Sequence, residues 1–142
     1  MYQLQVNNLQ INMSNEEIEV LSAHFHKTLM SFCDEMIASY KKPAFVMTRV
    51  ILPTLSANFI FGRINNVLPT LRKIVETRDT TLYKEIEGKF GEMDLAVNAT
   101  ISLIDEGEVE KENEDAIWKW VESFVLFTDK YNELVAASST SG

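Results

Sequence analysis

The chain has 142 residues, 46% of them hydrophobic, which suits one globular domain with its own core and excludes a disordered chain. Its 13 basic and 21 acidic residues give a formal net charge of -8, so we expect no nucleic-acid binding through direct phosphate contacts. Cys33 is the only cysteine and the segment MYQLQVNNLQ has no signal-peptide pattern, which excludes an intrachain disulfide and predicts a cytoplasmic protein.

The first thirteen residues alternate apolar and polar side chains on both sides of the pair Asn7 and Asn8. A two-residue turn at this pair would place the apolar side chains of a β-hairpin on one face. Gln3 and Gln5 would then lie on the opposite face, on a strand whose edge is free. We therefore predict a small N-terminal β-hairpin over residues 1–13, which either caps the core or adds to a partner chain.

A long helix is predicted to follow the hairpin. Ser14 and Glu17 form a capping box, which places the helix start at residue 14. Pro43 should end the helix after Lys41 or Lys42. Between these limits, apolar residues recur at spacings of three and four: Ile18, Leu21, Phe25, Leu29, Phe32, Met36 and Tyr40.

The stretch Ala44 to Phe61 has apolar residues on all sides of a helix, so we predict that it is the innermost element. A bilayer span is excluded because polar residues interrupt the stretch too often. Pro53 removes an amide donor, and we expect either a kink near residues 49–52 or a break into two short helices.

Three further helices are expected in the second half of the chain. Asn66 can cap a short helix with Pro69 in its first turn. A regular apolar series from Asp79 to about Glu106 favours one helix that continues through Gly88 and Gly91, although a break at these glycines is the competing interpretation. An acidic linker over residues 105–115 precedes the last helix, 114–137, and residues 138–142 should form a disordered tail.

The predicted fold is therefore mainly α: a single-domain bundle of five or six helices around a central apolar helix, with a small N-terminal β-hairpin. The domain covers residues 1–137, with the hairpin at 1–13 and the helices at 14–137.

No chemical signature stands out in this sequence. His26, Met30 and Cys33 stand at i, i+4 and i+7 on one helix face and could present three ligands to a soft metal, but they also widen the apolar stripe of that helix. Neither histidine is within hydrogen-bond reach of Cys33, and no EF-hand, Walker, GxGxxG, GxSxG or HExxH pattern occurs. We predict no catalytic residue, no metal ligand and no cofactor.

The remaining candidates are surfaces. Trp118 and Val125 lie off the core stripe of the last helix, and Phe45 and Phe61 lie on the central stretch. Together with Gln3 and Gln5 they form our candidate partner-binding set. The alternative is that two neighbouring helices cover the last helix on two sides.

These observations favour a non-enzymatic protein-protein interaction module, such as an adaptor, an inhibitor or an assembly factor. Its partner would be another protein or a second copy of this chain in a homodimer, and not a membrane. Two alternatives stay open. One is a small helical enzyme or ligand-binding protein with a pocket of acidic and histidine side chains. The other is an acidic inhibitor that mimics a nucleic-acid backbone.

Overall fold

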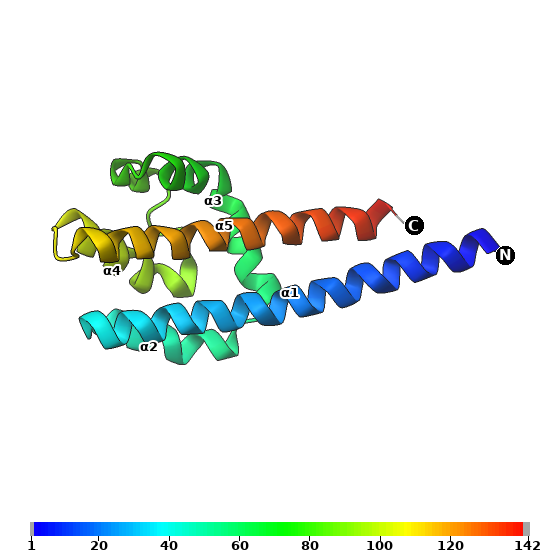
Figure 1. The fold of residues 1–142 in the computed structure, drawn as a ribbon, viewed down its shortest axis with the longest axis horizontal. Helices are drawn as coiled ribbons and strands as arrows, with labels where there is room; N and C mark the ends of the chain where they lie inside the picture. Colours follow the sequence, from blue (N-terminus) through cyan, green and yellow to red (C-terminus); the bar gives the residue numbers. More distant parts are fainter. Residues whose placement is uncertain (1, 141–142) are drawn as a thin grey trace.

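The protein is a helical structure with two long helices and a head of shorter ones (Figure 1). The computed structural model describes the backbone of residues 2–140 and the side chains of residues 15–138. Within these residues the elements, in chain order, are α1 (Tyr2–Tyr40), α2 (Pro43–Ile51), the 3-10 helix η1 (Leu52–Thr54), α3 (Ala57–Thr77), the 3-10 helices η2 (Thr80–Glu85) and η3 (Gly91–Met93), α4 (Asp94–Asp105) and α5 (Lys111–Thr140). The mainly α fold class is confirmed.

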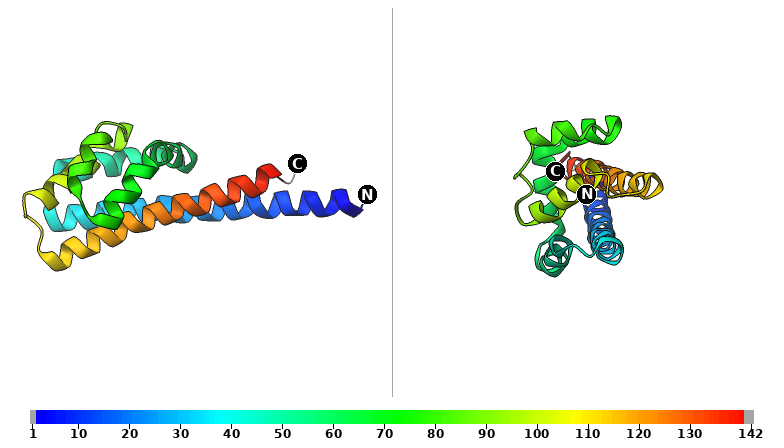
Figure 2. Two further views of the ribbon diagram at one scale, coloured as in Figure 1. Left: turned by 90° about the horizontal axis from the view of Figure 1, so that it is seen from above. Right: turned by 90° about the vertical axis from the view of Figure 1, so that its left-hand side faces the viewer.

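Helices α1 and α5 form the long axis of the molecule, where they lie side by side and antiparallel (Figures 1 and 2). Their 39 and 30 residues correspond to lengths of about 58 and 45 Å at 1.5 Å per residue. The shorter elements from α2 to α4 pack on the C-terminal half of α1 and on α5 as far as Asn132, and form, with these parts of the long helices, the head. Beyond the head the two long helices run on as a pair as far as Asn15 and Ser138, whose side chains are 3.5 Å apart.

The predicted N-terminal hairpin is wrong, because residues 2–13 belong to α1. Ser14 therefore lies inside a helix and is not a helix start. The sequence fits both periods: Leu4, Ile11 and Ile18 are seven residues apart, close to two helical turns. The pair Asn7 and Asn8 also lacks the glycine that two-residue hairpin turns favour. The side chains of Gln3 and Gln5 lie outside the described residues.

The stretch Ala44 to Phe61 is not one innermost helix. Pro53 lies in η1, and the chain restarts as α3, whose N-cap Ser56 accepts a hydrogen bond of 3.1 Å from the Phe59 amide. The predicted break into two helices is therefore confirmed. The central position is wrong, because α2 turns one face to α1 and α4 and exposes Val46, Met47 and Val50 on the other.

Helix α3 is longer than the sequence suggested. It runs through Gly62, Asn66 and Pro69, so the separate short helix capped by Asn66 is not found. Pro69 lies on the exposed side of α3, where water can bind the carbonyl that the missing proline N–H leaves free. The helix ends at Thr77, and its C-cap residue Arg78 has a left-handed φ of 56°.

The predicted continuous helix from Asp79 to Glu106 is wrong. The segment contains η2, a turn, η3 and α4, and the two glycines take left-handed conformations with φ of +81° at Gly88 and +60° at Gly91. These conformations cannot belong to a right-handed helix. The side chain of Asp94 holds the turn, because its Oδ1 accepts a hydrogen bond of 2.9 Å from the Phe90 amide.

The ends of the other helices agree with the sequence signals. Helix α1 ends at Tyr40, three residues before Pro43. Gly107, with φ of +67°, follows the end of α4, and Glu112 and Glu114 lie in the first turn of α5. The predicted tail overlaps α5 at residues 138–140, while residues 141–142 lie outside the described part of the chain. None of the helices in the described residues is long and apolar enough to cross a membrane.

The core lies where α1, α3 and α5 meet, and aromatic rings dominate it. The ring of Phe61 stacks on Phe25 at a centroid distance of 4.1 Å and on Tyr131 at 4.2 Å. An ion pair between Arg72 and Asp129 also ties α3 to α5, with two hydrogen bonds of 2.7 and 2.9 Å. These contacts fix α1, α3 and α5 relative to one another.

Candidate functional site: an apolar cavity in the helical head

The four described residues of the predicted partner-binding set lie in the core and do not form an exposed patch. The exposed fractions are 3% for Trp118, 4% for Val125 and 0% for both Phe45 and Phe61. The alternative that we left open for Trp118 and Val125 is therefore the one observed: the last helix is covered on more than one side. Trp118 and Val125 form a separate stripe on α5 because this helix is covered by more than one neighbouring element. They do not line a solvent-exposed groove.

The candidate metal-binding residues on α1 have other partners. The Nε2 atom of His26 is 2.7 Å from the carbonyl oxygen of Leu52, so this ring links α1 to η1. Burial and the nearby Asp34 carboxylate raise the pKa of the Cys33 thiol to about 11, which keeps it protonated at neutral pH. Among the described residues, no group of three His, Cys, Asp or Glu side chains could hold a metal ion.

An open hollow between α1 and α5 brings His24 near Glu16 and Glu17. All three residues belong to α1 and are exposed. The pocket that we considered required acids from different helices around a histidine, and this hollow does not provide that arrangement.

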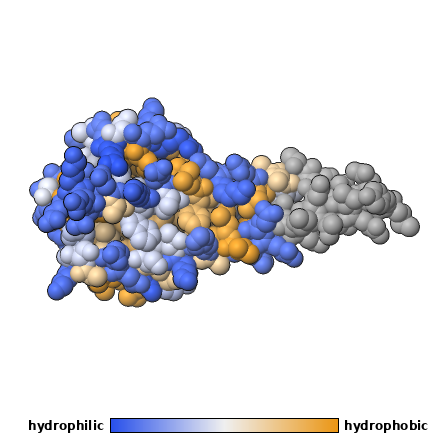
Figure 3. All heavy atoms as spheres, viewed as in Figure 1, coloured by the Kyte–Doolittle hydropathy of each residue, from blue (hydrophilic) through white to orange (hydrophobic). Residues whose placement is uncertain are grey.

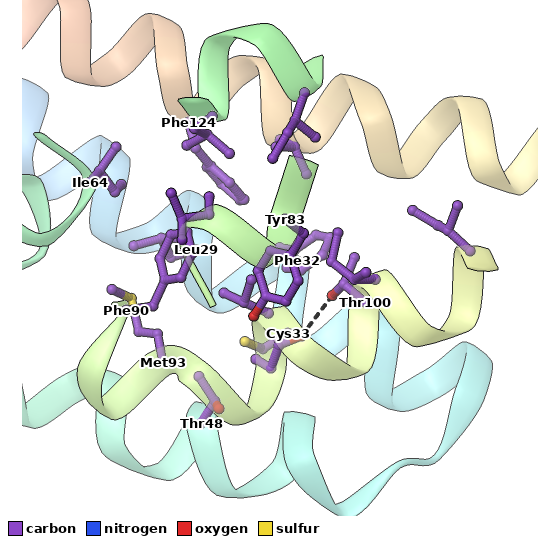
Figure 4. Close-up of a pocket in the computed structure, with 18 of the residues that line it drawn as sticks. Leu29, Phe32, Cys33, Thr48, Ile64, Tyr83, Phe90, Met93, Thr100 and Phe124 are labelled. Atoms are coloured by element: carbon purple, nitrogen blue, oxygen red, sulfur yellow. Dashed lines mark hydrogen bonds between the residues drawn. The ribbon is translucent and has the colours of Figure 1, made fainter. Parts of the chain in front are cut away.

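The most distinctive feature of the head is a cavity of about 120 Å³ between its helices (Figure 4). Leu29, Phe32 and Cys33 reach it from α1, Thr48 from α2 and Phe124 from α5. Further aliphatic and aromatic side chains from α3, η2, η3 and α4 complete the wall. Every lining residue is buried or half-buried.

Small side chains on α4 contribute to the cavity. Ala96 and Thr100, one helical turn apart, both line it, and they fill less space there than larger side chains would. Helix α4 cannot simply move inward to close the gap. Its position is set by the left-handed turn at Gly91 on one side and by its packing against α2 on the other.

The lining carries no charged side chain. Burial and the nearby carboxylates of Asp94 and Glu87 raise the pKa of Tyr83 to about 12, so this phenol is neutral, as is the Cys33 thiol. The Tyr83 hydroxyl donates to Asn98 and the Thr100 hydroxyl donates to the Ala96 carbonyl at 2.8 Å. A charged ligand would find no opposite charge here and would lose its hydration.

Two polar atoms of the lining residues have no partner. Within residues 15–138, the buried side-chain atoms without a hydrogen bond are Thr48 Oγ1, Trp118 Nε1 and Arg63 Nε. The first two belong to residues that line the cavity, one from α2 and one from α5. Each unpaired buried group costs about 1 to 3 kcal/mol, and folded proteins leave few of them.

Sequence reasoning identified Trp118 but assigned it to a surface, and it missed Thr48 altogether. A threonine in a short apolar helix gives no signal by itself. Comparison of the chain with protein-family models, with curated proteins and with solved structures found no match. The geometry of this chain alone therefore carries the functional argument.

Proposed function

We propose that this protein is a non-enzymatic binding protein that holds a small, neutral, mainly apolar molecule in the head cavity. One observation carries the proposal: an apolar space of about 120 Å³ lined by buried and half-buried side chains. Protein interiors pack as densely as organic crystals, and voids larger than a water molecule are few. An engineered apolar cavity of about 150 Å³ in another protein stays dry and binds benzene, so this cavity matches a single ring.

The expected affinity is moderate. A ligand with about six or seven heavy atoms can gain at most about 1.5 kcal/mol per atom, or about 9 to 10.5 kcal/mol in all, which corresponds to a limiting dissociation constant of about 0.02 to 0.3 µM. Imperfect fit and the cost of immobilising the ligand make the real affinity lower than this limit. We expect dissociation constants between about 1 µM and 1 mM for single-ring compounds.

Helix α2 is the wall best suited to open for ligand entry. It has nine residues, a left-handed Lys41 before it and the break at η1 after it. Its described ion pairs to the rest of the head are Lys42 with Glu108 at 3.2 Å and Arg49 with Asp34 at 2.9 Å, and both are partly exposed. Such pairs contribute little to stability, so the cost of displacing α2 comes mainly from uncovering the buried Phe45.

Titration with benzene and toluene, followed by ¹H–¹⁵N NMR, tests the proposal. We expect saturable shifts of amide signals from α1, α4 and α5 around the cavity, and a rise in melting temperature with ligand concentration. Ala96→Val should weaken binding at least tenfold, because its two extra carbon atoms occupy the space. Ala38→Val, on an exposed site of α1, is the matched control and should bind as the natural chain does. Absence of saturable binding, or equal binding by both variants, would refute the proposal.

Self-association is a second candidate function, and the outer face of α2 supports it. Val46, Met47 and Val50 lie on one side of this helix with exposed fractions of 45%, 51% and 70%. Figure 3 shows hydrophobic side chains at the lower edge of the molecule, where α2 lies in Figure 1. Two copies of a chain with a charge of -8 repel each other, and α2 contains no acidic residue, so this face is a place where they can meet with little repulsion.

Light scattering coupled to size exclusion tests this second candidate. If two copies meet through α2, Val50→Asp should give monomers at concentrations where the natural chain forms dimers. Val20→Asp is a closely matched control, because Val20 is 71% exposed on α1 and Val50 is 70% exposed on α2. If the natural chain is monomeric at every concentration tested, self-association is ruled out. The proposal of ligand binding in the head cavity does not depend on this result.

A further inference from the structure

We infer that the ligand of the head cavity is a pure hydrocarbon, a ring or a short branched chain that carries no hydrogen-bonding atom. The inference rests on the proposed function and names the chemical class of the ligand. It means that the cavity rejects alcohols, phenols and ketones of the same size. The observation that carries it is the surface of the cavity wall, to which nitrogen and oxygen atoms contribute almost nothing.

The lining residues contain few side chains that could pair with a polar ligand. Those with an N–H, O–H or S–H group are Cys33, Thr48, Tyr83, Thr100 and Trp118. The Thr100 hydroxyl donates to the Ala96 carbonyl at 2.8 Å (dashed in Figure 4), and the Tyr83 hydroxyl donates to Asn98. The thiol of Cys33 is only a weak donor. Two hydroxyls of the wall are therefore already used within the protein.

The two unpaired atoms of the lining residues do not offer a binding group either. Thr48 Oγ1 and Trp118 Nε1 have no hydrogen-bond partner, but both are covered by neighbouring protein atoms and closed to water. A ligand oxygen is about the size of a water molecule and must come within about 3 Å of a donor to form a hydrogen bond. These two atoms therefore lower the stability of the fold without becoming available to a ligand.

The backbone of the wall is also occupied. Most lining residues lie in helices, whose amides and carbonyls bond to one another. In the turn before η3, the Ile86 amide donates to the Tyr83 carbonyl at 3.0 Å. The Phe90 amide donates to Asp94 Oδ1 at 2.9 Å. The two lining residues of this turn therefore offer no free amide to a ligand.

A polar ligand atom would lose its hydrogen bonds to water on entry and gain none inside the cavity. A hydrocarbon has no such bonds to lose, and it gains dispersion contacts with the wall. Phenol and toluene have nearly the same size and differ mainly by hydroxyl and methyl, so the ratio of their affinities measures the difference. We expect phenol to bind about 10- to 100-fold more weakly than toluene.

NMR titrations with toluene and with phenol test the inference. Thr48→Val and Thr100→Val each remove a hydroxyl that a ligand cannot use, so both should leave the ratio of the two affinities unchanged. Met93→Gln is the positive variant, because it brings an amide group of similar length to a lining position. It should shift the ratio toward phenol by about tenfold or more.

Xenon separates the failure of this inference from the failure of the proposed function. A xenon atom forms no hydrogen bond, so its binding, followed by ¹²⁹Xe NMR, reports the cavity alone. If toluene and xenon bind the natural chain and phenol binds as tightly as toluene or more tightly, the inference is overturned and the proposed function stands. A ratio that changes in Thr48→Val would also overturn it, because a ligand would then reach that hydroxyl. If neither toluene nor xenon binds, both fail.

Discussion

Replacing Thr48 by valine should make the ligand-free protein more stable, which is unusual for a substitution in a core. The hydroxyl of Thr48 is buried and unpaired, so the folded state bears its loss of hydration without a compensating hydrogen bond. Valine has nearly the same shape and a similar helix propensity, and its methyl group suits the apolar wall. The substitution therefore removes a cost and creates no cavity.

The expected gain in stability follows from the free-energy cost of leaving a buried polar group without a hydrogen bond. Removal of a cost of about 1 to 3 kcal/mol, less some relaxation in the natural chain, should raise the free energy of unfolding by about 1 to 2 kcal/mol. For a domain of this length, the melting temperature should rise by about 3 to 8 °C. The change should lie in the transition midpoint, and the denaturant slope should stay constant, because both chains bury nearly the same surface.

Urea unfolding at neutral pH measures this effect, with Thr100→Val and Thr128→Val as controls. Both controls remove a hydroxyl that donates to a helical carbonyl, so they should be neutral or destabilising by up to about 1 kcal/mol. The reasoning is refuted if Thr48→Val destabilises the protein as much as the controls do. That result would mean that the Thr48 hydroxyl is satisfied in solution.

Three further predictions concern other parts of the head. Gly91→Ala should lower the free energy of unfolding by about 1 to 3 kcal/mol in urea melts, because φ is +60° and a Cβ would approach Arg63 Nε to 3.1 Å. The Arg72 guanidinium lowers the pKa of Asp129, so the pair should add under about 1 kcal/mol to the free energy of unfolding above pH ~4. This contribution should be lost as the pH falls through the lowered pKa. A difference in stability between the natural chain and Asp129→Asn that persists at acid pH would contradict the prediction. The Cys33 thiol, buried and with its pKa raised to about 11, should react with a thiol reagent at pH 8 only as fast as the protein unfolds, as shown by rates that rise with urea.

The helix boundaries that the sequence predicted correctly depend on local chemistry. Pro43 stops α1 because proline lacks an amide donor, and Gly107 follows α4 because it can adopt a left-handed φ. The acidic first turn and the apolar series indicated the last helix, although it begins and ends three residues beyond the predicted limits of 114 and 137. Each of these signals acts within a few residues, so it can be interpreted without tertiary contacts.

The errors arose where one pattern fitted two structures. Apolar residues in the first thirteen positions fit an alternating strand and also the spacing of a helix that continues to Tyr40. The series from Asp79 to Glu106 kept a helical spacing through Gly88 and Gly91, yet the chain turns at both. In α2, apolar residues on all sides indicated burial, although neighbours cover only one side of the helix.

The sequence by itself determined a mainly helical chain, the ends of several helices and the apolar character of the core, because these properties depend on nearby residues and on composition. Only the tertiary structure decided that Trp118 from α5, Thr48 from α2 and the small side chains Ala96 and Thr100 from α4 line one cavity. The physical reason is that a cavity is a property of several packed helices together and not of any single residue. It is the volume left when several helices, each fixed by its own contacts, cannot approach more closely.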